Sequence, residues 1–231
     1  MKNQPFDLYI VDGNITLFLT QDSDTSTSDV LHSSLLASLV SDSHDVSSEE
    51  WFVQYKRSMG LLCWVTLQQN ASTLARQPCS LLDFLTRQTG ATLSPEQLEM
   101  IGEAFATIKA LPKGSPALSD FLKHVQSSKT DLERISEDNF FTVCPMITLV
   151  LQDRMISLRL SFDVDEAVDE RFLDEEIPQE NIRGDMQVTQ WTAYLAEDNY
   201  NALRQDVIKK LGSKKETAIF RVSPQAYLVR V

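Results

Sequence analysis

Glycine is scarce in this sequence, and no two glycines lie close together. The 231 residues include seven glycines, and neighbouring ones are at least twelve positions apart. Nucleotide-binding loops of the Walker and Rossmann types need glycines a few residues apart, because the backbone must turn tightly and approach the phosphates. The sequence therefore excludes both kinds of nucleotide site. It also lacks the short motifs that mark serine hydrolases with a nucleophile elbow, zinc proteases and protein kinases.

Long hydrophobic segments are also missing. The longest apolar stretch, residues 59–67, has nine residues and is interrupted by a glycine and a threonine, whereas a transmembrane helix needs about twenty. Two aspartates and a glycine break up the first twenty residues, which lack the basic start and apolar centre of a secretory signal. We therefore expect no transmembrane segment and a cytoplasmic location, unless the chain is exported by a route that needs no signal.

Cysteines are few and are not spaced as metal ligands or redox pairs. Cys63, Cys79 and Cys144 match neither a zinc ribbon nor a CxxC motif, so we expect three free thiols. Cys63 and Cys144 lie in apolar runs and are predicted to be buried and slow to react. Cys79 follows Pro78 where a helix is predicted to begin, and a helix dipole there can lower a thiol pKa. It is a candidate nucleophile and the predicted fastest thiol, or alternatively a partly buried structural residue.

Clustered positive charge is nearly absent. The chain has 21 basic and 33 acidic residues and a formal net charge of -12. The only basic cluster comprises Lys209, Lys210, Lys214 and Lys215, and it suits the negative end of a helix dipole. Nucleic-acid binders usually carry extended basic patches, so we expect no nucleic-acid partner. Residues 1–50 and residues 163–180 each hold nine acids and one base.

The spacing of apolar residues predicts the fold. Up to residue 126 it is mostly helical, after an N-terminal hairpin that turns at Asp12 and Gly13, a dipeptide that tolerates the positive φ angles of a two-residue turn. Ser94 and Gln97 form a capping box at one helix start. Beyond residue 140, apolar and polar residues alternate as in strands. The predicted hairpin strands are residues 6–11 and 14–20, and the predicted helices are residues 29–41, 47–67, 80–89, 94–109, 116–126 and 198–211. The predicted later strands are residues 141–151, 156–162, 187–195, 217–222 and 226–231.

These elements predict a single α+β domain over residues 1–231, in which a helical cluster packs with a largely antiparallel β-sheet. Its sub-regions are a β-hairpin (residues 1–20), a helical cluster (29–126) and a β-rich region with two helices (140–231). We consider an arrangement in which the N-terminal hairpin joins the later strands. Residues 20–29 are polar and are predicted to form a mobile loop.

The acidic segment at residues 163–180 first suggests a calcium site. An EF-hand loop needs glycine at its sixth position and usually glutamate at its twelfth, but Val168 and Asp174 stand there. Its apolar residues recur at helical spacing, so the segment is predicted to form an acidic amphipathic helix. The apolar stripe consists of Val164, Val168, Phe172 and Leu173. Asp169, Glu170 and Asp174 are the candidate partner-binding residues, unless this face is simply solvated.

Asp120 and His124 are spaced four apart on a predicted helix and are therefore expected to share one face. A carboxylate that orients an imidazole is the arrangement needed for general-base catalysis. The alternative is an ordinary surface pair. His32 falls within an apolar stripe, and no two histidines have metal-ligand spacing, so we predict no metal site.

We therefore expect a noncatalytic protein-binding or regulatory protein that uses an acidic surface to bind a protein with a basic surface, without a cofactor. One alternative is a hydrolase or transferase that uses Cys79 or the Asp120 and His124 pair. Another is a carrier of an apolar small ligand, with a cavity between the predicted helix at residues 47–67 and the sheet.

Overall fold

A mixed β-sheet forms the middle layer of the protein. The structure is a computed structural model that describes residues 6–20, 25–43, 48–130 and 139–223. Its strands are β1 (Asp7–Val11), β2 (Asn14–Phe18), β3 (Trp64–Leu74), β4 (Gln126–Thr130), β5 (Asn139–Val143), β6 (Met146–Val150), β7 (Met155–Val164), β8 (Ile182–Leu195) and β9 (Ile219–Val222). The main strand order is β3-β8-β7-β6-β2-β1-β9, and β5 joins β4 to β7. Among these strands, β2 and β6 form the parallel pair and the other pairs are antiparallel.

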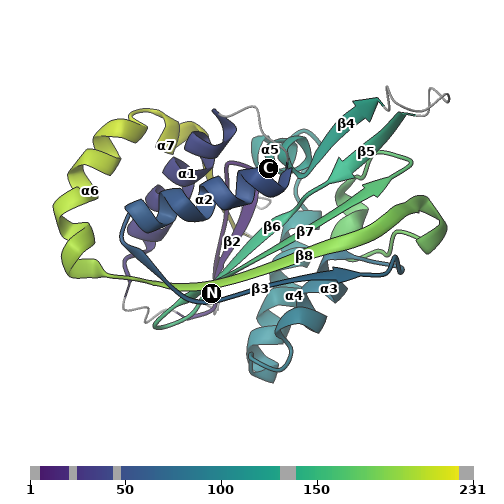
Figure 1. Cartoon of the computed structure of the whole chain (residues 1–231), viewed down its shortest axis with the longest axis horizontal. Coiled ribbons are helices and arrows are strands. Elements are labelled where there is room, and N and C mark those ends of the chain that lie inside the picture. The colour runs from purple at the N-terminus through teal and green to yellow at the C-terminus, as the bar shows by residue number, and fades with distance from the viewer. Residues whose placement is uncertain (1–5, 21–24, 44–47, 131–138, 224–231) are drawn as a thin grey trace, which may run out of the picture.

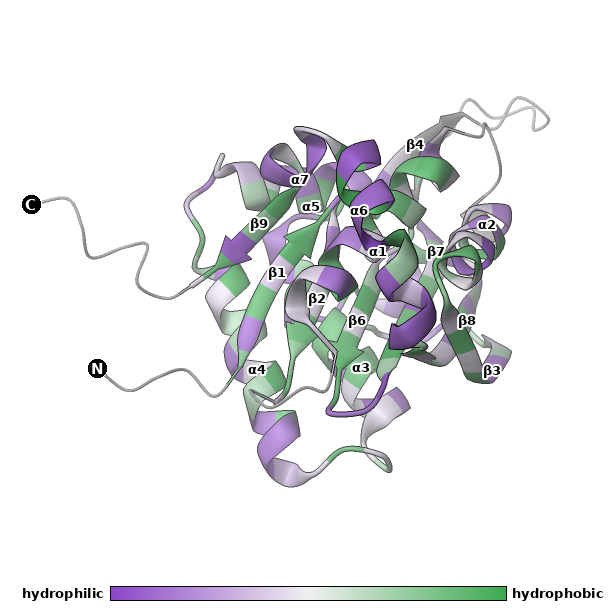
Figure 2. Ribbon diagram, turned by 90° about the vertical axis from the view of Figure 1, so that its left-hand side faces the viewer, coloured by the Kyte–Doolittle hydropathy of each residue, from purple (hydrophilic) through white to green (hydrophobic). Residues whose placement is uncertain are grey.

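Helices cover both faces of this sheet (Figure 1). One face carries α1 (Thr27–Asp42), α2 (Ser48–Leu61), α6 (Glu197–Leu211) and the short α7 (Lys214–Thr217). The other face carries α3 (Leu81–Thr89), α4 (Pro95–Lys109) and α5 (Pro116–Val125). The strands between the two helical layers are largely hydrophobic, whereas α6 and α7 are hydrophilic over much of their surface (Figure 2). The predicted α+β fold, with helices packed on a largely antiparallel sheet, is confirmed.

The N-terminal hairpin turns where the sequence predicts. Asp12 has a φ of 47° and Gly13 a φ of 74°, which are the positive values that a two-residue turn requires. Strand β1 pairs with β9, and β2 pairs in parallel with β6. Segments from opposite ends of the chain therefore lie side by side in one sheet, in the arrangement considered from the sequence.

The predicted helix at residues 47–67 is wrong in its last six residues. Helix α2 ends at Leu61, and the chain then enters β3, which pairs along its length with β8. Cys63 has a φ of 64° at this corner, and the aromatic and β-branched residues that follow favour a strand. The apolar run is also not surrounded by other helices, because Leu61 is 74% exposed and Leu67 is 55% exposed.

Two other sequence predictions need correction, one for a loop boundary and one for the helical cluster. Residues 27–29 are not part of a loop, because α1 begins at Thr27 and Asp29 is buried in an ion pair with Arg204. The predicted helical cluster at residues 29–126 also contains the long strand β3. Residues 21–24 of the predicted loop and the predicted strand at residues 226–231 lie outside the described residues.

The two helical layers bury different kinds of side chain. The layer formed by α3, α4 and α5 packs an almost wholly apolar set of residues on the sheet. Helix α1 instead buries four serines toward its neighbours. Two of them form hydrogen bonds with aromatic residues, since Trp64 Nε1 donates to Ser33 Oγ at 2.9 Å and Tyr55 Oη donates to Ser34 Oγ at 3.2 Å. Because serine buries little apolar area, this layer depends more on hydrogen bonds and aromatic packing.

Candidate functional site

The acidic segment does not form the predicted amphipathic helix. Residues up to Val164 still belong to β7, and the segment then contains only two short 3-10 helices, η1 (Glu170–Leu173) and η2 (Gln179–Asn181). Pairing of β7 with β8 fixes its beginning, and like charges along a longer helix would repel one another. The predicted apolar stripe is nevertheless buried, as residues Val164, Val168, Phe172 and Leu173. The β-rich region at residues 140–231 therefore lacks the second long helix predicted from its sequence.

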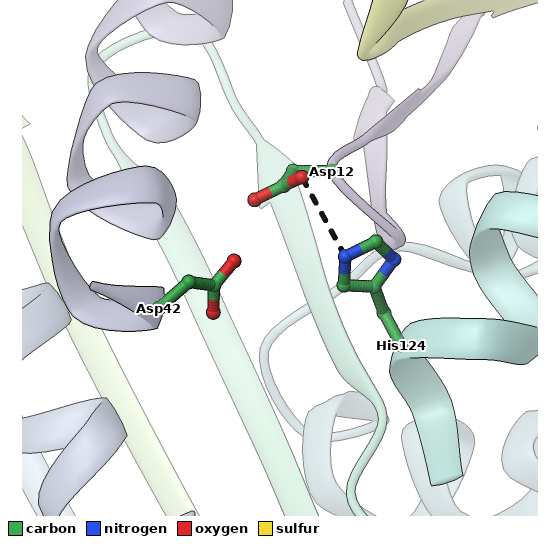
Figure 3. A group of neighbouring side chains, drawn as sticks. All are labelled: Asp12, Asp42 and His124. Atoms are coloured by element: carbon green, nitrogen blue, oxygen red, sulfur yellow. Dashed lines mark ion pairs between the residues drawn. The ribbon is translucent and has the colours of Figure 1, made fainter. Parts of the chain in front are cut away.

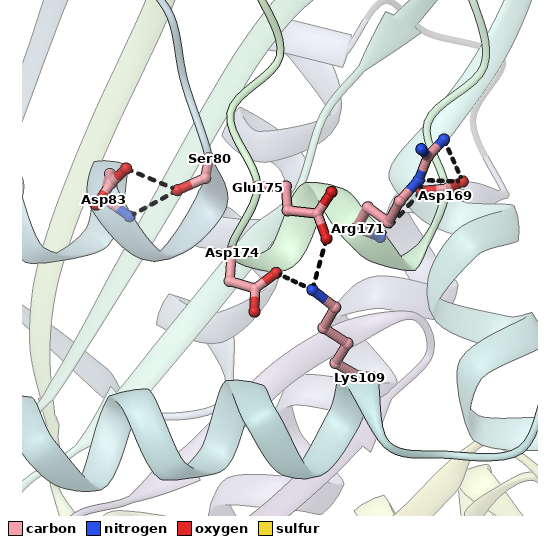
Figure 4. Close-up of polar contacts among 7 residues, drawn as sticks. All are labelled: Ser80, Asp83, Lys109, Asp169, Arg171, Asp174 and Glu175. Atoms are coloured by element: carbon pink, nitrogen blue, oxygen red, sulfur yellow. Dashed lines mark hydrogen bonds and ion pairs between the residues drawn. The ribbon is translucent and has the colours of Figure 1, made fainter.

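The three predicted partner-binding acids each form an ion pair within the chain. Asp174 lies 2.5 Å from Lys109 Nζ, which also contacts Glu175 at 2.8 Å. These contacts connect the end of α4 to the residues after η1 (Figure 4). They raise the pKa of Lys109 through hydrogen bonds from its ammonium group to both carboxylates. Asp174 is therefore already partly neutralised before any partner binds.

The other two predicted acids are paired as well. Glu170 lies 3.0 Å from Lys113 Nζ, whose side chain is 88% exposed. Asp169 accepts hydrogen bonds from the backbone N–H and the guanidinium of Arg171, with 2.9 Å from Arg171 Nη2 to Asp169 Oδ2 (Figure 4). These hydrogen bonds from Arg171 lower the pKa of Asp169. Both cations are exposed to solvent, which screens the two ion pairs, although the Glu170 side chain itself is only 17% exposed.

A hollow of about 280 Å³ opens beside η1. It is lined by buried apolar side chains, including Val168 and Phe172, and by four carboxylates and one guanidinium. The carboxylates belong to Glu166, Asp169, Glu175 and Glu176, and the guanidinium belongs to Arg171. The excess of carboxylates makes this hollow negative. We refer to it below as the acidic hollow.

Two carboxylates of the acidic hollow are not paired with a cation in the described part of the chain. Glu166 and Glu176 form no ion pair with any of the residues that the structure describes. The segment that carries Glu176 is anchored by a two-hydrogen-bond bridge between Ile177 and Cys79, with N···O distances of 2.9 and 3.2 Å. The backbone next to Glu176 is therefore held in place, while the carboxylates of Glu166 and Glu176 are available to a partner. The sequence predicted an acidic surface here but not which of its acids are paired, because the pairing depends on α4.

Cys79 does not have the surroundings of an activated nucleophile. Its side chain is buried, and burial raises the pKa of the thiol to about 12. Its Sγ donates to the Ser80 carbonyl oxygen at 3.4 Å, and Ser80 rather than Cys79 caps α3, by accepting a hydrogen bond from the Asp83 N–H. The predicted burial of the thiols is wrong, since Cys79 is buried whereas Cys63 and Cys144 are only half-buried.

Asp120 and His124 lie together on α5, as predicted. His124 Nδ1 lies 2.9 Å from the Asp120 carbonyl oxygen and 3.4 Å from Asp120 Oδ1. Hydrogen bonding to the Asp120 side chain raises the pKa of His124 to about 9. At neutral pH the ring is therefore protonated and has no free lone pair with which to act as a general base.

The same site contains residues that the sequence did not connect with His124. Asp12, in the β1–β2 turn, lies 3.6 Å from His124 Nε2 through its Oδ1 atom. Asp120 Oδ2 accepts a hydrogen bond from Gly13 N at 2.8 Å. Burial raises the pKa of Asp12. The turn was predicted and the helix was predicted, but nothing within either segment indicates that they meet.

The hollow between α2 and the sheet has a mixed lining. It measures about 290 Å³ and lies against Phe52 and Val53 of α2, where a cavity for an apolar ligand was considered. Lys56, Arg159, Gln69 and Gln187 also line it. This polar and cationic lining does not favour a wholly apolar ligand.

No helix among the described residues has the length and hydrophobicity needed to cross a membrane.

Comparisons with known proteins identify no family. No family model matches this sequence, and no curated protein matches it. Among solved structures, a delta-endotoxin aligns with a TM-score of 0.43 at 10% identity, over 80% of this chain and 82% of its own. The activated Cyt2Ba monomer from Bacillus thuringiensis subsp. israelensis aligns with a TM-score of 0.33 at 9% identity, over 63% and 79% of the two chains. The Evf virulence factor aligns with a TM-score of 0.35 at 7% identity, over 94% and 85%. Because these three TM-scores are below 0.5, the similarities decide nothing about what this chain does.

Proposed function

We propose that this chain is a noncatalytic protein-binding protein whose acidic hollow receives a cationic side chain of a partner protein. The observation that carries this proposal is that two carboxylates lining the hollow, Glu166 and Glu176, form no ion pair among the described residues and lie beside buried apolar side chains. A lysine or arginine side chain has a charged end and an apolar stem. Its charge would meet Glu166 and Glu176 while its stem packs over Val168 and Phe172.

The net charge of the chain supports the same class of partner. A formal charge of -12 attracts basic surfaces and repels acidic ones over about a Debye length. This attraction favours association with a basic protein and disfavours nucleic acid, in keeping with the expectation from the sequence. The proposal also keeps the cytoplasmic location expected from the sequence.

The geometry gives less support to the enzyme hypothesis. Cys79 is buried with a raised pKa, and the imidazole of His124 is protonated at neutral pH. Neither group is in the ionisation state that a nucleophile or a general base requires. The binding hypothesis needs no such activation.

The proposal is tested with a fluorescein-labelled octalysine peptide as the probe. Binding is measured by fluorescence anisotropy for the wild-type chain and for the double variant Glu166→Gln/Glu176→Gln. Each exposed charge pair contributes about 0.2–1 kcal/mol, so losing two charges should weaken binding about fivefold. Binding should also weaken as salt is raised, because exposed ion pairs are screened.

A matched control distinguishes peptide binding at the hollow from a general effect of the net charge of the chain. The double variant Asp206→Asn/Glu216→Gln removes the same charge from exposed positions on α6 and α7, in the helical layer on the other face of the sheet. It should bind octalysine like the wild type, apart from a small general effect of net charge. Equal weakening in both double variants would mean that the peptide senses only the net charge, and the proposed site would be abandoned.

A further inference from the structure

Three side chains from distant parts of the sequence converge at the tip of the N-terminal hairpin. They are Asp12 in the β1–β2 turn, Asp42 at the last position of α1 and His124 near the end of α5. One donor atom from each lies within 4.8 Å of the others. Figure 3 shows the three side chains directed toward a common space from three separate elements. Among the described residues, no other group of three or more potential metal ligands lies this close together.

Two of these side chains, His124 and Asp42, contact a neighbouring residue through one atom and leave a second atom available to bind a metal. His124 Nδ1 contacts the Asp120 carbonyl oxygen at 2.9 Å, so Nε2 is the ring nitrogen that faces Asp12. Trp51 Nε1 donates to Asp42 Oδ1 at 2.6 Å, which leaves Oδ2 without this contact. A histidine oriented through its second nitrogen, and a carboxylate oriented by an N–H donor, are the outer contacts that metal ligands commonly have.

A buried oxygen in this cluster has no partner. Asp12 is 6% exposed, and its Oδ2 atom has no hydrogen bond among the described residues. Figure 3 shows this second oxygen turned away from His124, toward the side on which Asp42 lies. Ser38, one turn before Asp42 on α1, is 1% exposed, and its hydroxyl forms no hydrogen bond of normal length, although it lies near enough to Asp12 to favour the ionised carboxylate. A buried polar atom without a partner destabilises the folded state, and a bound cation would satisfy a carboxylate oxygen directly.

We propose that Asp12, Asp42 and His124 bind a divalent transition-metal ion of the zinc type. One imidazole nitrogen and two carboxylate oxygens suit zinc, whereas calcium takes six to eight oxygen ligands. Zinc lies about 2.0–2.2 Å from such ligands, so the donor atoms must move closer together than 4.8 Å on binding. Asp42 is exposed at the end of a helix, and its Oδ2 atom, which takes no part in the Trp51 contact, can make this movement. The metal takes the place of the proton on His124 Nε2.

Such an ion would connect both helical layers to the hairpin. Helix α1 lies on one face of the sheet and α5 on the other, and Asp12 lies between them in the turn. Because binding to the folded state alone stabilises it, the ion should raise the unfolding temperature. This inference concerns a different region from the acidic hollow and does not depend on the proposed function.

The test uses the full chain, stripped with EDTA and then titrated with zinc chloride alone by equilibrium dialysis. We expect one zinc ion per wild-type chain. Asp42→Asn and His124→Gln should each weaken binding at least tenfold, while His32→Gln, which changes a half-buried histidine of α1 outside the cluster, should bind like the wild type. Cobalt in place of zinc should give no thiolate band in the near ultraviolet, which excludes the cysteines as ligands.

Control measurements keep this test decisive. Circular dichroism establishes that each variant is folded, and Asp42→Asn carries the test alone if His124→Gln does not fold, because Asp42 is exposed. Zinc should raise the unfolding temperature of the wild type more than that of Asp42→Asn. A wild-type chain that takes up no stoichiometric zinc overturns the proposal and assigns the cluster to an ion pair between His124 and its aspartates. Equal zinc affinity in Asp42→Asn and His32→Gln overturns it as well.

Discussion

Replacing Arg204 by methionine should destabilise the protein strongly, although Arg204 lies on the surface helix α6. Arg204 Nε donates to Asp29 Oδ1 at 2.9 Å, and Nη2 donates to Asp29 Oδ2 at 2.7 Å. This two-point contact joins residues 175 positions apart, at the start of α1 and in the middle of α6. The Asp29 side chain is only 2% exposed. Without Arg204, its carboxylate would remain buried with no cation beside it.

The size of the effect follows from the exposure of the two partners. Removing one partner of a buried ion pair costs about 3–5 kcal/mol, because the other charge is left uncompensated. The Arg204 side chain is 35% exposed, so water can partly replace it, and we expect the lower end of this range, about 3 kcal/mol. Removing both charges together, as in Asp29→Leu/Arg204→Met, should cost about 1 kcal/mol or less, since no buried charge is left alone.

The measurement is the free energy of unfolding in urea, followed by tryptophan fluorescence. Trp64 of β3 and Trp191 of β8 are 4% and 1% exposed and belong to the buried cluster that α1 forms with the sheet, so their emission should report the loss of this packing. The matched control is Arg221→Met. Arg221 and its partner Asp7 are 66% and 40% exposed, and this variant should lose about 1 kcal/mol or less. If Arg204→Met loses no more than Arg221→Met, the reasoning from burial is refuted.

Three further outcomes follow from burial and backbone geometry. At pH 8, a soluble thiol reagent should modify the two half-buried cysteines first and reach Cys79 only on unfolding, because burial raises its pKa to about 12; rapid labelling of Cys79, identified by mass spectrometry, would contradict its placement. Gly13→Ala should lose about 2–4 kcal/mol in urea denaturation, since Gly13 has a φ of +74° and a Cβ there would lie 2.2 Å from the His124 Cβ; a loss under 1 kcal/mol would mean that the turn is less tight than described. Leu17→Ala should lower the free energy of unfolding by about 2–5 kcal/mol, because Leu17 is 0% exposed in the apolar cluster between the sheet and α3, α4 and α5. The control Leu67→Ala, at a position 55% exposed, should change it by about 0.5 kcal/mol or less.

Some features were determined by residues that are neighbours in the sequence. Asp12 and Gly13 form the predicted turn because their conformational preferences act within the dipeptide itself. The capping box of α4 forms between Ser94 and Gln97, three residues apart. Gly212, with a φ of 53°, ends α6 where the sequence predicts. Each of these interactions spans at most a few residues, so it can be inferred without the rest of the fold.

Other features were decided by pairing with distant strands. Residues 64–67 follow a helix and continue its apolar pattern, but they belong to β3, which pairs with β8 more than 110 positions away. The acidic segment likewise begins as an extension of β7 against β8. Local spacing predicted a helix in both places. The backbone hydrogen bonds and side-chain packing of the sheet outweighed it, because helix propensity contributes only a few tenths of a kcal/mol per residue.

At the two candidate sites as well, the sequence determined some features and the tertiary structure decided others. Composition alone located the acidic region, but contacts with Lys109 and Lys113 determined which of its carboxylates are neutralised. Asp12, Asp42 and His124 gave no common signal in the sequence, where 30 and 82 positions separate them. They meet because the β1–β2 turn projects between the end of α1 and α5. A ligand cluster of this kind depends on the placement of whole elements, and only the tertiary structure fixes that placement.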